Sequence, residues 1–151
     1  MRCANVGRIG VFLGALVLSA FAFASVAGAE SIAFIVNAGN PASSMSPAEL
    51  KRLYENDTVK WPDGKNIVLY DLPVKNDARK KVSTAVLGKE AEEVARDWAN
   101  KKITNTAKNP PVVVSSGVLV QSRVAEDPGA IGYMPKGDVT NAKVRIIAVI
   151  D

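Results

Sequence analysis

The residues best suited to hold a ligand form the short polar segment Lys75-Asn76-Asp77-Ala78-Arg79, which opens a predicted helix shortly after a predicted strand. Free backbone amides at a helix N-terminus attract anions, and Lys75 and Arg79 would add positive charge there. The segment therefore predicts an anion site at the carboxyl end of a strand, held by amide and Arg79 contacts. The same residues also fit an ordinary helix start, in which Asn76 or Asp77 caps the first turn and the charges are solvated.

Two groups of serines are further candidates. Ser43 and Ser44 follow the first predicted strand, and α/β proteins bind ligands beyond the carboxyl ends of their strands, although a simple polar turn fits these residues equally well. Ser115-Ser116-Gly117 precedes another predicted helix. We expect a plain N-cap there rather than a second anion site.

The composition argues against catalysis. The chain has no histidine, and its one cysteine is Cys3, so a Ser–His nucleophile pair and the commonest transition-metal ligand are excluded. The acidic residues are scattered or lie in the cluster Glu90, Glu92 and Glu93, which is typical of a helix start. The sequence therefore predicts a binding protein rather than an enzyme, with no catalytic set, no metal site and no cofactor.

The first 29 residues have the pattern of a secretory signal peptide. Arg2 and Arg8 precede the apolar run over residues 9–24, and Ala27-Gly28-Ala29 is a small-residue cleavage site. A membrane anchor is the alternative, but the run is short for a span of about 20 residues. We expect cleavage after Ala29, which predicts a periplasmic or secreted protein with no remaining membrane span.

Residues 30–151 are then one domain of ordinary size. The formal net charge of the whole chain is +4, and Arg2 and Arg8 contribute two of those charges. A nearly neutral domain with dispersed basic residues does not have the concentrated basic face of a nucleic-acid-binding protein.

Apolar periodicity and turn signals predict an α/β fold. We expect strands at residues 31–37, 67–71, 112–114, 130–134 and 143–150, and helices at 47–55, 78–87, 90–102 and from a Ser115 cap to about 126. Strands that alternate with helices predict a mostly parallel sheet with helices on both faces. Trp61 is predicted to close a turn over the core, and Trp98 to lie on the buried face of its helix.

Several motifs, in this order and spacing, resemble the substrate-binding protein of bacterial phosphate ABC transporters. They are Val36-Asn37, Met45-Ser46-Pro47-Ala48-Glu49-Leu50, Trp61-Pro62-Asp63-Gly64 and Pro128-Gly129-Ala130-Ile131-Gly132-Tyr133. Members of that family are type 2 periplasmic binding proteins with two α/β lobes that close on phosphate. The resemblance implies that residues 30–151 form a single lobe of that fold.

The family's phosphate contacts do not carry over. In the longer proteins this lobe supplies an arginine and a Ser-Gly-Thr run after the second strand, and here Leu72 and Asn76-Asp77-Ala78 occupy those positions. Lys75 and Arg79 flank the site and restore positive charge. The expected ligand residues are therefore Lys75, Asn76, Arg79, Ser43 and Ser44.

Two functions follow as hypotheses. The first is an exported solute-binding protein for phosphate or another small oxyanion that works with an ABC permease. In it a homodimer or another partner supplies the wall that a single lobe lacks. The second is a ligand-free interaction or regulatory module of an envelope complex, which keeps the binding-protein fold.

Overall fold

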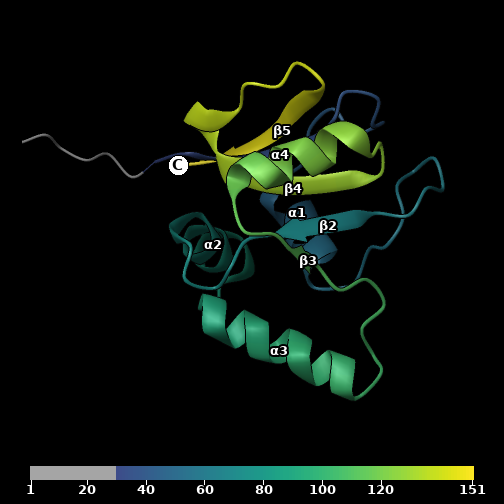
Figure 1. Ribbon diagram of the computed structural model, residues 1–151. Coiled ribbons are helices and arrows are strands. Elements are labelled where there is room, and N and C mark those ends of the chain that lie inside the picture. Colours follow the sequence, from purple (N-terminus) through teal and green to yellow (C-terminus); the bar gives the residue numbers. More distant parts are fainter. Residues whose placement is uncertain (1–29) are drawn as a thin grey trace, which may run out of the picture.

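A five-stranded sheet with helices on both faces forms the body of the computed structural model, which describes residues 30–151 (Figure 1). The predicted signal peptide lies outside the described residues. The strands are β1 (Ile32–Asn37), β2 (Val68–Asp71), β3 (Val112–Val113), β4 (Ala130–Pro135) and β5 (Val144–Ile150). The helices are α1 (Pro47–Tyr54), α2 (Asp77–Val82), the π-helix η1 (Ser83–Leu87), α3 (Ala91–Ile103), α4 (Gly117–Glu126) and the 3₁₀ turn η2 (Lys136–Asp138). None of the helices within residues 30–151 combines the length and hydrophobicity needed to cross a bilayer.

The predicted α/β class and element order are confirmed, with small shifts at the boundaries. The helix expected at residues 78–87 is present as α2 followed directly by η1, and it ends at Gly88 in the left-handed conformation (φ 68°). The fourth long helix is capped by Ser116, whose hydroxyl accepts from the Leu119 amide, and not by Ser115. The predicted helix cap is therefore present, one residue later than expected.

The predicted mostly parallel sheet is wrong, because β1 runs against its neighbours. The strand order is β3-β2-β4-β1-β5, and β1 is antiparallel to both β4 and β5. Only the short β2–β3 and β2–β4 ladders are parallel, so most paired residues are in antiparallel ladders. The continuous apolar run of β1 reports burial on both faces, and burial does not specify strand direction.

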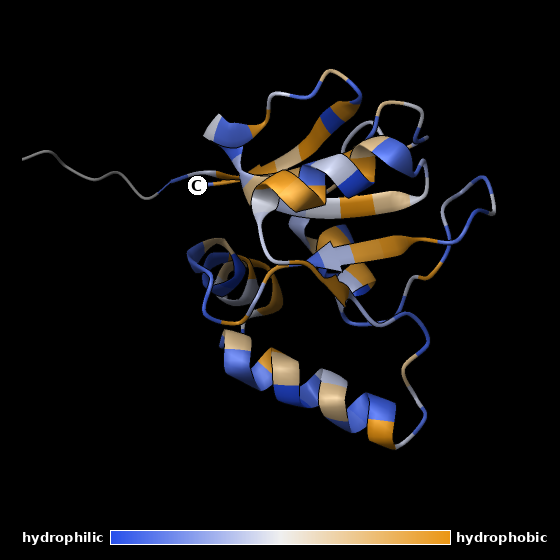
Figure 2. Ribbon diagram, in the orientation of Figure 1, coloured by the Kyte–Doolittle hydropathy of each residue, from blue (hydrophilic) through white to orange (hydrophobic). Residues whose placement is uncertain are grey.

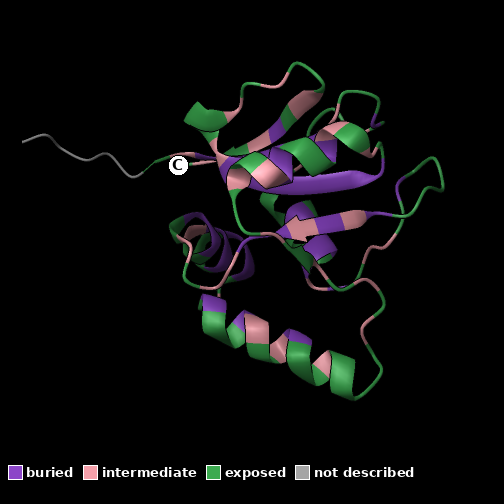
Figure 3. Cartoon of the chain, in the orientation of Figure 1, coloured by how far each residue is buried: buried purple, intermediate pink, exposed green. Residues whose placement is uncertain are grey.

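Helices pack on both faces of the sheet, and alternate residues of β4 point to opposite faces. Tyr133 packs with Tyr54 of α1 and with Phe34 of β1, at ring-centroid distances of 6.0 and 5.5 Å. Gly132 points the other way, toward Val120 and Val124 of α4. β4 is therefore buried on both sides (Figure 3), and hydrophobic colours run along the central strands (Figure 2).

The motif residues that carry the family resemblance have structural roles here. The Asn37 amide group donates to the Val124 and Ala125 carbonyls at the end of α4, at 3.1 and 2.9 Å. Ser46 forms a capping box with Glu49 at the start of α1. Asn37 thus joins the end of β1 to α4, and Ser46 and Glu49 cap α1, so these residues have structural roles.

The predicted roles of both tryptophans are confirmed. Trp61 is 4% exposed, and its indole N–H donates to the Gly129 carbonyl at 2.8 Å, which joins its turn to the turn before β4. Trp98 is 7% exposed and lies on the buried face of α3.

Gly132 is the point where α4 approaches the sheet most closely, so a side chain there should destabilise the fold. A Cβ on Gly132 would collide with Val120 Cγ1, which is buried and short. We expect Gly132→Ala to lower the free energy of unfolding by about 1–3 kcal/mol, as overpacking does in tight cores. Gly137→Ala is the matched control, because a Cβ at Gly137 meets no atom within 4 Å. Equal urea-denaturation midpoints for the two variants would contradict this packing.

Candidate anion-binding site

The carboxyl end of β2 holds a buried ion pair. Asp71 is the last residue of the strand, and Arg79 lies in the first turn of α2. Asp71 is 2% exposed and Arg79 is 4% exposed. Arg79 Nη1 contacts Asp71 Oδ2 directly. A buried carboxylate is stable only with a positively charged or hydrogen-bonding partner. The loop between β2 and α2 brings Arg79 to Asp71 as that partner.

The remaining oxygen of Asp71 is also fully used. The Tyr133 hydroxyl from β4 and the Leu72 amide both donate to Asp71 Oδ1, the latter at 2.8 Å. Together these bonds tie β2, α2 and β4 to one carboxylate. The buried pair is therefore electrically neutral, and both carboxylate oxygens of Asp71 have partners.

Tyr54 completes this buried polar cluster. Its hydroxyl donates to the Tyr70 carbonyl at 3.0 Å. Burial raises the pKa of Tyr54 and of Tyr133 well above the ordinary tyrosine value, and the charge on Arg79 offsets only part of that rise. Both phenols consequently stay protonated, and remain hydrogen-bond donors, at more alkaline pH than a free tyrosine does.

The start of α2 has the capped arrangement that the sequence left open as an alternative. Asn76 Oδ1 accepts from the amides of Ala78 and Arg79, at 2.9 and 3.4 Å. An anion could reach these amides only by displacing the Asn76 side chain. The Asp77 side chain is exposed to solvent, and its Oδ1 lies 3.6 Å from Nζ of Lys80.

The predicted site residues in this loop thus have different surroundings. Arg79 faces the protein, not the solvent, because Asp71 requires its charge. Asn76 is used by the helix cap. Lys75 is exposed and free to meet an anion.

Ser43 and Ser44 do not join this site, which corrects the prediction that all five residues share one ligand. Val36, near the end of β1, pairs with Ile131 at the start of β4. Because β1 runs against β4 and β2, its carboxyl end lies at the opposite end of the sheet from Asp71. The two serines line a different cavity, described below.

A small cavity of about 230 Å³ lies beside the ion pair, between the β2–α2 loop, α3 and β3. Its walls include Arg79 and Asp71, the ring of Trp98, and Lys102 near the end of α3. Lys102 is exposed and brings a second cation to this end of the sheet. The sequence placed Lys102 only at the end of the predicted helix 90–102, and nothing in the spacing shows that α3 returns to β2.

No metal site accompanies these residues: in the part of the chain that the structure describes, no three acidic, histidine or cysteine side chains are placed to share an ion.

Solved phosphate-binding proteins share this fold. The chain is similar to an ABC-type phosphate transport receptor from Vibrio cholerae (TM-score 0.59, 16% identity, 78% of this chain and 45% of that one). It is also similar to a putative phosphate ABC transporter substrate-binding protein with bound phosphate from Clostridium perfringens (TM-score 0.59, 18% identity, 78% of this chain and 44% of that one). A third similar structure is PstS from Borrelia burgdorferi (TM-score 0.62, 16% identity, 79% of this chain and 47% of that one).

The chain spans less than half the length of each of these proteins. No protein-family model matches it, and no curated protein does. The predicted resemblance is therefore confirmed at the level of the fold: residues 30–151 have the architecture of one part of a phosphate-transport substrate-binding protein.

Removing Arg79 should cost stability before it affects any ligand. We expect Arg79→Ala to lower the free energy of unfolding by about 3–5 kcal/mol, because it leaves the Asp71 carboxylate buried and unpaired. The double variant Asp71→Asn/Arg79→Met removes both charges but keeps a side-chain oxygen that accepts from Tyr133 and Leu72, so it should recover much of that loss. Urea denaturation of the three proteins measures the difference. If Arg79→Ala were as stable as the parent, the pair would not have the structural role described here.

Proposed function

We propose that this protein is an exported solute-binding protein that holds phosphate or another small oxyanion at the carboxyl end of β2, in association with an ABC permease. The observation that carries the proposal is the fold shared with three phosphate-transport binding proteins, one of them described with bound phosphate. Export rests on the signal-peptide pattern of residues 1–29.

The charges at this end of the sheet favour an anion. Arg79 neutralises Asp71, and Lys80 lies close enough to Asp77 to offset its charge. Lys75 and Lys102 remain as exposed cations of the β2–α2 loop and of α3. We infer that these two lysines meet the anion, and that Arg79 acts indirectly by holding Asp71 neutral.

The affinity should be modest. Lysines at the surface gain little from a single ion pair, since water competes for both charges. One lobe also leaves much of a small anion in water. A second copy of the chain, the permease or another envelope protein would have to cover the open side, and such a cover would strengthen every contact beneath it by excluding water.

A second function is favoured by a specific observation. Among the groups best suited to hold phosphate, the amides of Ala78 and Arg79 are engaged by Asn76, and Nη1 of Arg79 is engaged by Asp71, while Nε of Arg79 has no hydrogen-bond partner within residues 30–151. This arrangement suits a ligand-free interaction or regulatory module that retains the binding-protein fold.

Titration with phosphate, followed by amide NMR at constant ionic strength, separates the two functions. The first predicts saturable shifts of the amides from Leu72 to Arg79, and a Kd that rises roughly two- to fivefold in Lys75→Gln and in Lys102→Gln, the size of one exposed ion pair. Lys108→Gln is the matched control, because Lys108 is exposed and lies in the loop before β3, outside the candidate site. A folded protein without such shifts would exclude the oxyanion site and favour the interaction module.

A further inference from the structure

A larger cavity, of about 510 Å³, lies at the other end of the sheet. Three segments enclose it: the loop between β1 and α1, one side of α1, and the turn that carries Trp61. Its volume is within the range of small-molecule sites in proteins. None of its lining residues belongs to the candidate oxyanion site at the carboxyl end of β2.

The loop that forms one wall is held in place by several hydrogen bonds. Arg145 Nη2 of β5 donates to the carbonyls of Asn40 and Ala42, at 2.7 and 2.6 Å. The Met45 amide donates to the Ile147 carbonyl at 3.0 Å. A loop fixed at both ends in this way presents Ser43 and Ser44 in a defined position, which lowers the entropy lost when a ligand binds.

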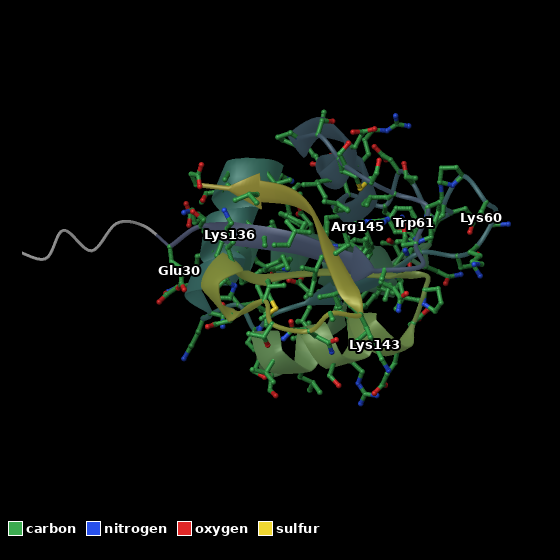
Figure 4. The ribbon with its side chains drawn as sticks, turned by 90° about the horizontal axis from the view of Figure 1, so that it is seen from above. Glu30, Lys60, Trp61, Lys136, Lys143 and Arg145 are labelled. Carbon is green, nitrogen blue, oxygen red and sulfur yellow. The ribbon has the colours of Figure 1, made fainter. Side chains whose placement is uncertain are left out.

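The opposite wall is equally well supported. The Trp61 indole is held by its bond to Gly129, and Lys60 pairs with Asn66 across the same turn. Figure 4 shows Trp61 close to the body of the protein and Lys60 farther out on the same loop. Trp61 is 4% and Leu53 1% exposed, so the apolar surface that a ligand can reach comes mainly from Pro41, Met45 and Pro62 beside the buried indole ring.

The charged groups around the cavity favour a negatively charged ligand. Arg52 and Lys60 line it, and neither forms an ion pair within residues 30–151. The acidic lining residue, Glu49, accepts from the Ser46 amide and hydroxyl, both at 2.7 Å, and these bonds lower the pKa of its carboxyl group. Glu49 keeps its negative charge, which the nearby Arg52 also stabilises, and Lys60 adds a second cation, so the lining carries two positive groups against one negative group.

We propose that this cavity binds a small aromatic carboxylate. The ring would lie on the apolar surface beside Trp61, and the carboxylate would meet Arg52 and the hydroxyls of Ser43 and Ser44. An inorganic anion would leave the apolar walls in water, and a neutral aromatic would leave the excess positive charge of the lining without a partner. The combination of both features selects an organic anion.

Phenylacetate is a suitable probe, with phenylacetamide as its neutral counterpart. Amide NMR of the full protein should show saturable phenylacetate shifts at Ser43, Ser44 and the Trp61 indole N–H, with the Leu72–Arg79 amides unchanged. Arg52→Gln should raise the Kd about tenfold, as the loss of a charge-assisted hydrogen bond does. Arg96→Gln on the exposed side of α3 is the matched control and should bind as the parent does.

Ser44→Phe provides a second variant, because the new ring would enter the cavity from an exposed position and should abolish the shifts without unfolding the chain. Three results would overturn the proposal: no shifts with phenylacetate, equal binding of phenylacetamide, or shifts confined to the Asp71–Arg79 end. A failure here leaves the phosphate titration unaffected, since the two experiments monitor opposite ends of the sheet.

Discussion

The buried carboxylate of Asp71 is the constraint on which the candidate site depends. A charge at the end of a core strand is stable only if it is paired, and Arg79 is the residue that reaches it. That requirement fixes the path from β2 into α2, and the Tyr133 hydroxyl brings β4 to the same carboxylate. The arginine that would most readily bind an anion is consequently part of the structural core. Any ligand at this end of the sheet must be held mainly by groups outside the pair.

The direction of β1 places the two candidate sites at opposite ends of the sheet. Because β1 is antiparallel to β4 and β5, the loop after β1 and the loop after β2 leave the sheet at opposite ends. One end has the neutral ion pair, a small cavity and the exposed Lys75 and Lys102. The other has a larger cavity with an apolar wall and two cations, Arg52 and Lys60, that form no salt bridge within residues 30–151. The two ends therefore suit different ligands.

Much of the fold could be predicted from the sequence because local signals specify it. Ser46 and Glu49 mark the start of α1, Gly88 ends the helical segment before α3, and the apolar strands alternate with helices. Strand direction could not be predicted, because the apolar run of β1 is the same whichever way it pairs. The error over Ser43 and Ser44 follows directly from that ambiguity. The role of Arg79 did have a signal: Asp71 ends an apolar strand, and a charge there requires a nearby cation.

NMR of the Arg79 guanidinium group during a phosphate titration tests most directly whether Arg79 is a structural residue. If it is held by Asp71, its N–H signals should be protected from exchange with water and should stay unchanged as phosphate is added. Any phosphate response should then appear on the ammonium groups of Lys75 and Lys102. Guanidinium signals that exchange rapidly and move in proportion to phosphate saturation would contradict the account, because they would show that Arg79 is itself the anion ligand.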